Sequence, residues 1–219
     1  MPWPGRCRGY YEGAARAKGY HRIAGLDEAG RGCLFGPVYA AAVILSPERP
    51  VRGLRDSKEL SPGQREELAA EIRDRSHAWA AASVEAAEID RMNIYQASRL
   101  AMKLALEKIE PRPDYLLVDA LTLDVTVPQK GLVHGDARCR SIAAASILAK
   151  VERDRAMLEW DRIYPQYGLC RNKGYGSPEH LEALRLHGAT PQHRTSFAPV
   201  RLLGYQMTLF DAPEIRRCH

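Results

Sequence analysis

The 219-residue sequence has no apolar run approaching the roughly 18 residues that a membrane span needs. Residues 1–18 also lack the apolar core of a secretory signal peptide. Cysteine is scarce: the five residues are an odd number, and none form a Cys-x-x-Cys pair. Scattered thiols are typical of a reducing compartment and argue against a disulfide framework or a cysteine-based zinc site. The sequence therefore predicts a cytoplasmic protein with no membrane association.

Internal repeats and low-complexity tracts are also absent, and 45% of the residues are hydrophobic, enough to bury a core. The length suits one domain with tails. We expect a basic, flexible leader at residues 1–20, a folded domain at 21–204 and a tail at 205–219. The net charge of +5 favours a polyanionic partner, although ordinary basic proteins share such a charge.

Hydrophobic periodicity predicts strands and helices in mixed alternation. The strands are expected at residues 22–27, 38–45, 77–84 and 115–118, and the helices at 62–76, 85–109, 140–164 and 178–187. A further apolar segment covers residues 132–136, and the link after Pro165 is irregular and rich in glycine. This order indicates an α/β fold.

Two adjacent carboxylates, Asp27 and Glu28, end the first predicted strand, and Gly30, Arg31 and Gly32 follow. Glycines allow a ligand to approach the main chain closely, and an arginine is a fork-shaped donor suited to phosphate. Carboxylates that can bind a metal therefore lie within six residues of glycines and an arginine that can bind a phosphate. The combination suggests phosphodiester chemistry.

Three other interpretations of this stretch were weighed. A P-loop would need Lys and Ser or Thr where Arg31 and Gly32 stand. A dinucleotide-binding fingerprint would need a glycine where Phe35 stands. Both motifs therefore fail. The remaining alternative is a hairpin loop with an exposed acidic pair.

Asp119 ends a second apolar strand, and Asp136 closes the third apolar segment. Ligands gather at strand ends in open α/β sheets, so these acids can converge with Asp27 and Glu28. Clustered carboxylates repel unless cations join them, and oxygen ligands suit Mg²⁺ or Mn²⁺. Two such ions about 4 Å apart can activate a water and stabilise a leaving oxygen. A single strand-end aspartate, taken alone, is more often a turn former or helix cap.

The stretch 27–32, followed by Gly36-Pro37-Val38, resembles the signature of ribonuclease HII, the type 2 ribonuclease H family. Further motifs in the family's order extend this resemblance over about residues 22–204. It implies a ribonuclease H-like fold, a mixed central β-sheet flanked by helices with a C-terminal helical segment, in which 21–204 is the catalytic domain. By the same resemblance, the metal-binding and catalytic carboxylates are Asp27, Glu28, Asp119 and Asp136.

The resemblance also implies a set of substrate-binding residues. The backbone of Gly30, Arg31 and Gly32 is expected to read the ribose 2′-hydroxyl, which separates RNA from DNA. Tyr175 is expected to pack near the sugar at the RNA–DNA junction. The other candidates for contacts with the substrate are Lys58, Ser146, Lys150, Lys173 and Arg194.

The implied activity is cleavage of the RNA strand of RNA–DNA hybrids and incision 5′ of single ribonucleotides in duplex DNA, as in ribonucleotide excision repair. The products would carry 3′-hydroxyl and 5′-phosphate ends, and two Mg²⁺ or Mn²⁺ ions would assist. Two alternatives stay open: a nuclease or strand-transfer enzyme that acts on DNA alone, and a binding module that has lost catalysis.

The tail contains Gln206-Met207-Thr208-Leu209-Phe210. This segment resembles the pentapeptide with which bacterial proteins dock on the replication sliding clamp. Gln206, Met207, Leu209 and Phe210 would then fill a hydrophobic pocket as a short extended peptide. The alternative is that the tail packs on its own domain. We expect a monomer.

Overall fold

The computed structural model describes residues 9–203. Its centre is a five-stranded sheet in the order β3-β2-β1-β4-β5. The strands are β1 Ile23–Ala29, β2 Val38–Leu45, β3 Ser76–Val84, β4 Tyr115–Asp119 and β5 Gln129–Leu132. The first three strands pair antiparallel, whereas β1, β4 and β5 run parallel. The mixed sheet of the predicted ribonuclease H-like α/β fold is thus confirmed.

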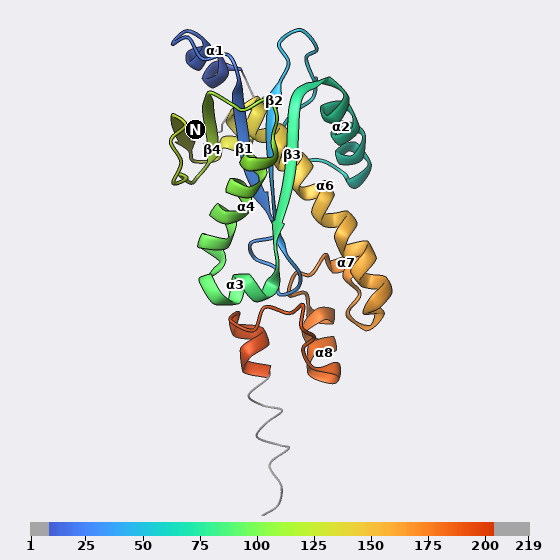
Figure 1. Ribbon diagram of the computed structural model, residues 1–219. Coiled ribbons are helices and arrows are strands. Elements are labelled where there is room, and N and C mark those ends of the chain that lie inside the picture. Colours follow the sequence, from blue (N-terminus) through green and yellow to red (C-terminus); the bar gives the residue numbers. More distant parts are fainter. Residues whose placement is uncertain (1–8, 204–219) are drawn as a thin grey trace, which may run out of the picture.

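Helices cover both faces of this sheet (Figure 1). They are α1 Tyr10–Arg16, α2 Pro62–Arg75, α3 Ala86–Met92, α4 Ile94–Lys108, α5 Gly135–Arg138, α6 Arg140–Ile163, α7 Leu169–Asn172 and α8 Pro178–His187. Single 3₁₀ turns, Ser57–Glu59 and Pro165–Tyr167, precede α2 and α7. None of the helices within residues 9–203 has the length and apolar character of a membrane span.

Alternation along the strands divides the core into two layers. Ala40 and Ala42 of β2 face α4, whereas Ala41 and Val43 face α2 and α6. Successive side chains of a strand point to opposite faces, so a continuous apolar run such as β2 is the expected pattern for a strand that is covered on both sides. The central strands are therefore covered on both faces, and a ligand reaches them most readily at their ends.

Helix α6 lies unusually close to β1. A Cβ atom added to Gly25 would lie 2.1 Å from the carbonyl carbon of Ser141, so no larger residue fits without movement of the backbone. The facing residues of α6, 143–145, are all alanine and fully buried. Small residues on both partners allow this approach, which brings the first turns of α6 to the strand that carries Asp27.

The structure divides the predicted helix at 85–109 into α3 and α4. Asn93 lies between them with φ of 74°, a conformation that ends one helix, and its side chain accepts a hydrogen bond from the backbone N–H of Gln96 to cap the next. Asparagine tolerates a positive φ better than most residues. The apolar periodicity continues through this break, so periodicity alone predicts one uninterrupted helix.

Two further segments differ from the sequence prediction. Residues 129–132, where no strand was predicted apart from the start of the apolar segment at Leu132, form strand β5 beside β4. Asp136, expected at the end of an apolar strand-like segment, lies instead in the first turn of the short helix α5. His134, with φ of 54°, turns the chain from β5 into that helix.

The interpretation of residues 1–20 as a leader also changes where the structure describes them, because residues 10–16 form α1. Glu12 is buried, and its Oε1 accepts hydrogen bonds from the backbone N–H and hydroxyl of Ser141 and from the thiol of Cys139. The first N–H groups of a helix have no partner within it, and a carboxylate there is favourable. Glu12 thus caps α6 from a distant part of the chain.

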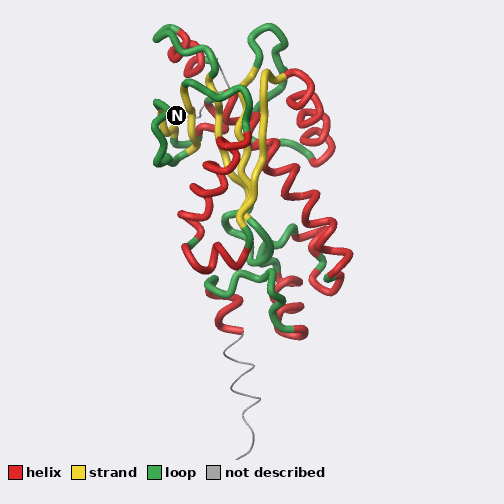
Figure 2. The backbone as a smooth tube through the Cα atoms, in the orientation of Figure 1, coloured by secondary structure: helices red, strands yellow, loops and turns green. Residues whose placement is uncertain are grey.

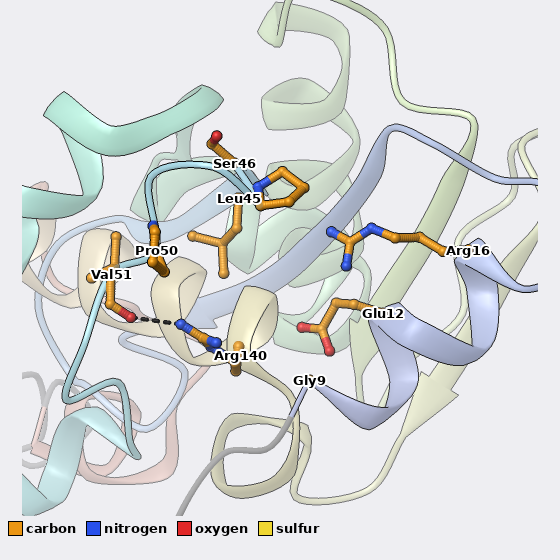
Figure 3. A pocket seen from close by; sticks show the side chains of 9 residues that line it. Gly9, Glu12, Arg16, Leu45, Ser46, Pro50, Val51 and Arg140 are labelled. Carbon is orange, nitrogen blue, oxygen red and sulfur yellow. Dashed lines mark hydrogen bonds between the residues drawn. The ribbon is translucent and has the colours of Figure 1, made fainter.

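Figure 3 shows Glu12 among the residues that line a small cavity beside α1. Its carboxylate lies between the helix α1 that carries it and Arg140, which donates from Nη2 to the carbonyl of Val51 at 2.7 Å. A small cavity of about 80 Å³ remains beside it, and Arg16 also lines that cavity. The basic character of residues 1–20 gave no indication of this buried acidic contact.

Candidate active site

The lower ends of the strands in Figure 2 run into a cluster of loops that separates the sheet from the C-terminal helices. A cavity of about 320 Å³ contains most of the residues predicted for the site. Its lining comprises Asp27, Glu28, Ala29, Gly30, Arg31, Gly32, Ser57, Lys58, Asp119, Asp136, Ser146, Lys150 and Tyr175. The structure therefore brings together residues that are up to 148 positions apart, from Asp27 to Tyr175.

The acidic pair belongs to β1 itself, which continues to Ala29. Asp27 is only 5% exposed, and its Oδ1 accepts a hydrogen bond from the backbone N–H of Glu28 at 2.7 Å. Oε1 of Glu28 lies 3.0 Å from Nη1 of Arg31, whereas its Oε2 is buried without a hydrogen-bond partner. Oε2 of Glu28 is thus an oxygen of the acidic pair that remains for a ligand.

The other two carboxylates come from neighbouring elements. Asp119 is the last residue of β4, and its Oδ1 accepts a hydrogen bond from the backbone N–H of Gly135 at 2.7 Å. Asp136, the next residue after that donor, is 7% exposed. Nζ of Lys58 lies 3.7 Å from Oδ2 of Asp136.

Burial, with a smaller contribution from neighbouring charges, raises the pKa of three of these acids. Burial raises the pKa of Asp27 well above its usual range, and the charges of Glu28 and Asp119 add to the rise. Burial also raises the pKa of Glu28, although the Arg31 guanidinium opposes it. The pKa of Asp119 is raised by burial, with a contribution from Asp136. Burying like charges together is unfavourable unless a cation compensates them.

The donor set fits divalent cations such as Mg²⁺ or Mn²⁺, which prefer carboxylate oxygens. Two observations are consistent with a cation site: Oε2 of Glu28 has no hydrogen-bond partner, and the pKa values of Asp27 and Asp119 are raised. As the side chains stand, no three His, Cys, Asp or Glu residues within 9–203 form a group that could hold an ion.

The loop after β1 presents its backbone to the same cavity. Gly30 has φ of 95°, and an added Cβ would lie 2.1 Å from Nε of Arg153. Arg153 itself is fully buried and donates to the carbonyl oxygens of Lys173 and Phe35 at 2.8 and 3.3 Å. Only glycine therefore fits at position 30. Arg153, which the sequence analysis missed, joins this loop to the segment that carries Tyr175.

Arg194 has a different place from the one predicted. It is 0% exposed and does not line the cavity. Its Nε donates to the carbonyl of Gly36 at 2.9 Å and its Nη1 to the carbonyl of Arg31 at 3.0 Å. Burial lowers its pKa to about 10. Arg194 therefore supports the glycine-rich loop from behind, where it cannot contact a substrate.

Lys173 also lies outside the cavity lining, in an adjoining groove that it shares with Lys150. Tyr175, two residues later, is 45% exposed at the cavity. The guanidinium carbon of Arg153 lies 5.8 Å from the centre of its ring, within the range of a cation–π contact. The same turn thus directs Tyr175 to the cavity and Lys173 to the groove.

Two buried histidines fix the backbone of Tyr175. The backbone N–H of Thr190 donates to Nδ1 of His193 at 2.9 Å, so His193 carries its proton on Nε2. That nitrogen lies 3.1 Å from Nε2 of His180, whose Nδ1 is 2.8 Å from the carbonyl oxygen of Tyr175. Burial lowers the pKa of His193 to about 3 and keeps the ring neutral. The sequence offered no signal for this pair beyond two isolated histidines.

Ser146 links the cavity to the 3₁₀ turn before α2. Its hydroxyl lies 3.0 Å from that of Ser57, and both side chains are buried. Ser146 also lowers the pKa of Asp27, against the larger effect of burial, through a side-chain hydrogen bond. Lys58, next to Ser57, is 82% exposed and points its charge into the open side of the cavity. Both predicted residues thus belong to the site.

The sheet topology and the acidic strand ends place the chain among the ribonuclease H-like nucleases. A ribonuclease H2 of Pyrococcus horikoshii has a TM-score of 0.72 and 26% identity, over 86% of this chain and 99% of that one. A ribonuclease HII of Archaeoglobus fulgidus, solved in complex with PCNA, has a TM-score of 0.68 and 29% identity, over 83% and 96%.

The family model of ribonuclease HII matches residues 24–200. A ribonuclease HII of Solibacter usitatus is 57% identical over 196 residues, which cover 90% of this chain and 86% of that protein. The chain belongs to the ribonuclease HII family, whose members are metal-dependent endoribonucleases that cleave the RNA strand of RNA–DNA hybrids. The resemblance recognised in the sequence is confirmed.

The buried acids generate a prediction about stability. The pKa of Asp27 is higher in the folded than in the unfolded chain, so its ionisation at neutral pH costs folding free energy that is absent in acid. We expect Asp27→Asn to stabilise the metal-free protein at pH 7 by about 1–3 kcal/mol, and the gain to shrink as pH falls through the raised pKa. Thermal unfolding in chelator measures it.

The matched control is Asp124→Asn, which changes an exposed aspartate outside the cavity and should alter stability little. A metal-free Asp27→Asn protein that unfolds below the wild-type temperature would contradict the electrostatic account of the cavity.

Proposed function

We propose that the cavity incises duplex DNA on the 5′ side of a single embedded ribonucleotide, as well as cutting longer hybrids, and leaves 3′-hydroxyl and 5′-phosphate ends. One observation carries the proposal: a glycine-rich backbone held against the carboxylates. Residues 30–32 line the same cavity as the acids, and the two glycines can present only backbone atoms there, so a ribose contacted by the loop has its adjacent phosphate near the acids.

Asp27, Glu28, Asp119 and Asp136 are proposed to hold two Mg²⁺ or Mn²⁺ ions. When bound, such ions supply an activated water and stabilise the leaving 3′ oxygen. The protein contributes the positions of the carboxylates: β1 and β4 fix Asp27 and Asp119 on adjacent parallel strands, and the Gly135 N–H holds one Asp119 oxygen.

The cationic and aromatic residues are assigned the recognition of the substrate. Lys58 is exposed at the mouth of the cavity and carries a charge that a phosphate can reach. The half-exposed ring of Tyr175 offers a flat face to the sugar at the junction. The 2′-hydroxyl distinguishes RNA from DNA at one nucleotide, and the backbone of Gly30 and Gly32 is the proposed reader.

A labelled duplex with one ribonucleotide tests this function, with Mg²⁺, with Mn²⁺ and with chelator. We expect metal-dependent cutting 5′ of the ribonucleotide and no cutting of the all-DNA duplex. Asp119→Asn should lower the rate at least about 100-fold, because it removes a charged ligand of the reacting phosphate's ions; Asp124→Asn, outside the cavity, is the control.

Cutting of the all-DNA duplex would show instead a nuclease without a ribose reader. Tight binding of the ribonucleotide duplex with no cutting in either metal would leave only a binding module.

We further propose that Gln206, Met207, Leu209 and Phe210 dock on the replication sliding clamp. These residues lie outside the part of the chain that the structure describes. The complex of the Archaeoglobus relative with PCNA supports an association of this kind. We expect the full chain to be retained on immobilised clamp and a chain truncated after Gly204 to be lost. Equal retention of both would refute the proposal.

A further inference from the structure

A second cavity, of about 420 Å³, adjoins the catalytic one and forms a groove between α2, α6 and α7. The side chain of Lys150 lines both. The groove is lined by Pro62, Arg65, Glu66, Lys150, Val151, Asp154, Arg155, Leu158, Cys170, Arg171 and Lys173. Five basic side chains against two acidic ones leave it positively charged.

The ion pairs within the groove show which of these charges are available. Lys150 lies 2.5 Å from Asp154, and Arg155 lies 2.6 Å from Glu66. Arg65 is engaged by backbone carbonyl oxygens. The other two cations of the groove, Arg171 and Lys173, form no ion pair among residues 9–203, although the charge of Arg171 contributes to the lowered pKa of Asp161 and of Glu179.

The backbone that carries these two cations is fixed. Lys173 has φ of 51°, and its carbonyl oxygen accepts a hydrogen bond from the buried Arg153. The N–H of Lys173 bonds to the carbonyl of Leu169, which closes α7 against the same turn. Tyr175 lies two residues further along, at the catalytic cavity. The backbone positions of these two cations are therefore set relative to the proposed ribose site.

We propose that this groove binds the backbone phosphates of the nucleic-acid strand that the catalytic cavity holds, on one side of the cut. The inference rests on the proposed function, because it takes Tyr175 to mark the junction sugar. A strand that passes Tyr175 and Lys150 meets Arg171 and Lys173 next, and phosphate is the ligand common to every nucleotide. The groove adds affinity without reading sequence.

Salt dependence of binding tests the groove directly. Each phosphate contact contributes about 0.9 to the slope of log affinity against log salt on duplex DNA. We expect Arg171→Gln/Lys173→Gln to lower the slope for a fluorescent RNA–DNA hybrid, measured in chelator so that nothing is cut. Between about 50 and 200 mM salt the wild-type affinity should then fall roughly tenfold more than that of the variant.

The control is Lys103→Gln/Lys108→Gln, which removes the same charge from exposed positions of α4, on the opposite side of the sheet from α2 (Figure 1). Its slope should equal that of the wild type. If the double variant of the groove fails to fold, the exposed Arg171→Gln change alone should still lower the slope, by about half as much.

A groove variant whose slope equals that of the control overturns the inference. Hybrids shortened on one or the other side of the cut give a second readout. The difference in salt slope between the groove variant and the wild type should vanish when the side that would occupy the groove is removed, and it should persist when the other side is removed. A defect that persists with both shortened hybrids also overturns it. Cleavage by the wild-type protein is scored separately, so a failed groove and a failed proposed function remain distinguishable.

Discussion

Several carboxylates of this chain are buried in one cavity, where loss of hydration and, to a smaller extent, mutual repulsion oppose their ionisation. Three acids of the cavity have raised pKa values because the sheet and α6 remove them from water together. Apolar packing of helices on both faces of the sheet offsets the free-energy cost of burying these acids. Functional sites commonly reduce stability in this way. The divalent cations proposed for this cavity would offset that cost.

A second feature is the support of the catalytic loop by buried arginines. Arg153 on α6 and Arg194 near the C-terminal end bind backbone carbonyl oxygens of the glycine-rich loop and of the Tyr175 turn. Each also has a buried nitrogen without a partner, so neither is placed at minimal cost. They join sheet, long helix and C-terminal segment at the proposed ribose reader. The geometry of that reader therefore depends on residues that touch no substrate.

Much of this could be predicted from the sequence, for identifiable reasons. The apolar strands, the acids at their ends and the alanine-rich helix leave local patterns, and they were placed correctly except that Asp136 lies on a short helix. The division at Asn93 and the cap by Glu12 depend on partners or conformations that periodicity does not record. Arg194 matched a family motif, but only its burial shows that it acts on the loop.

The central claim is that the acids of the cavity bind divalent cations together. The most direct test counts Mn²⁺ ions bound per chain at saturation, by paramagnetic resonance of the free ion, for the wild type and for Asp27→Asn/Asp119→Asn. The account predicts two ions for the wild type, the number that two-metal phosphodiester chemistry requires. It predicts fewer than one for the variant. Equal binding by both proteins would contradict it.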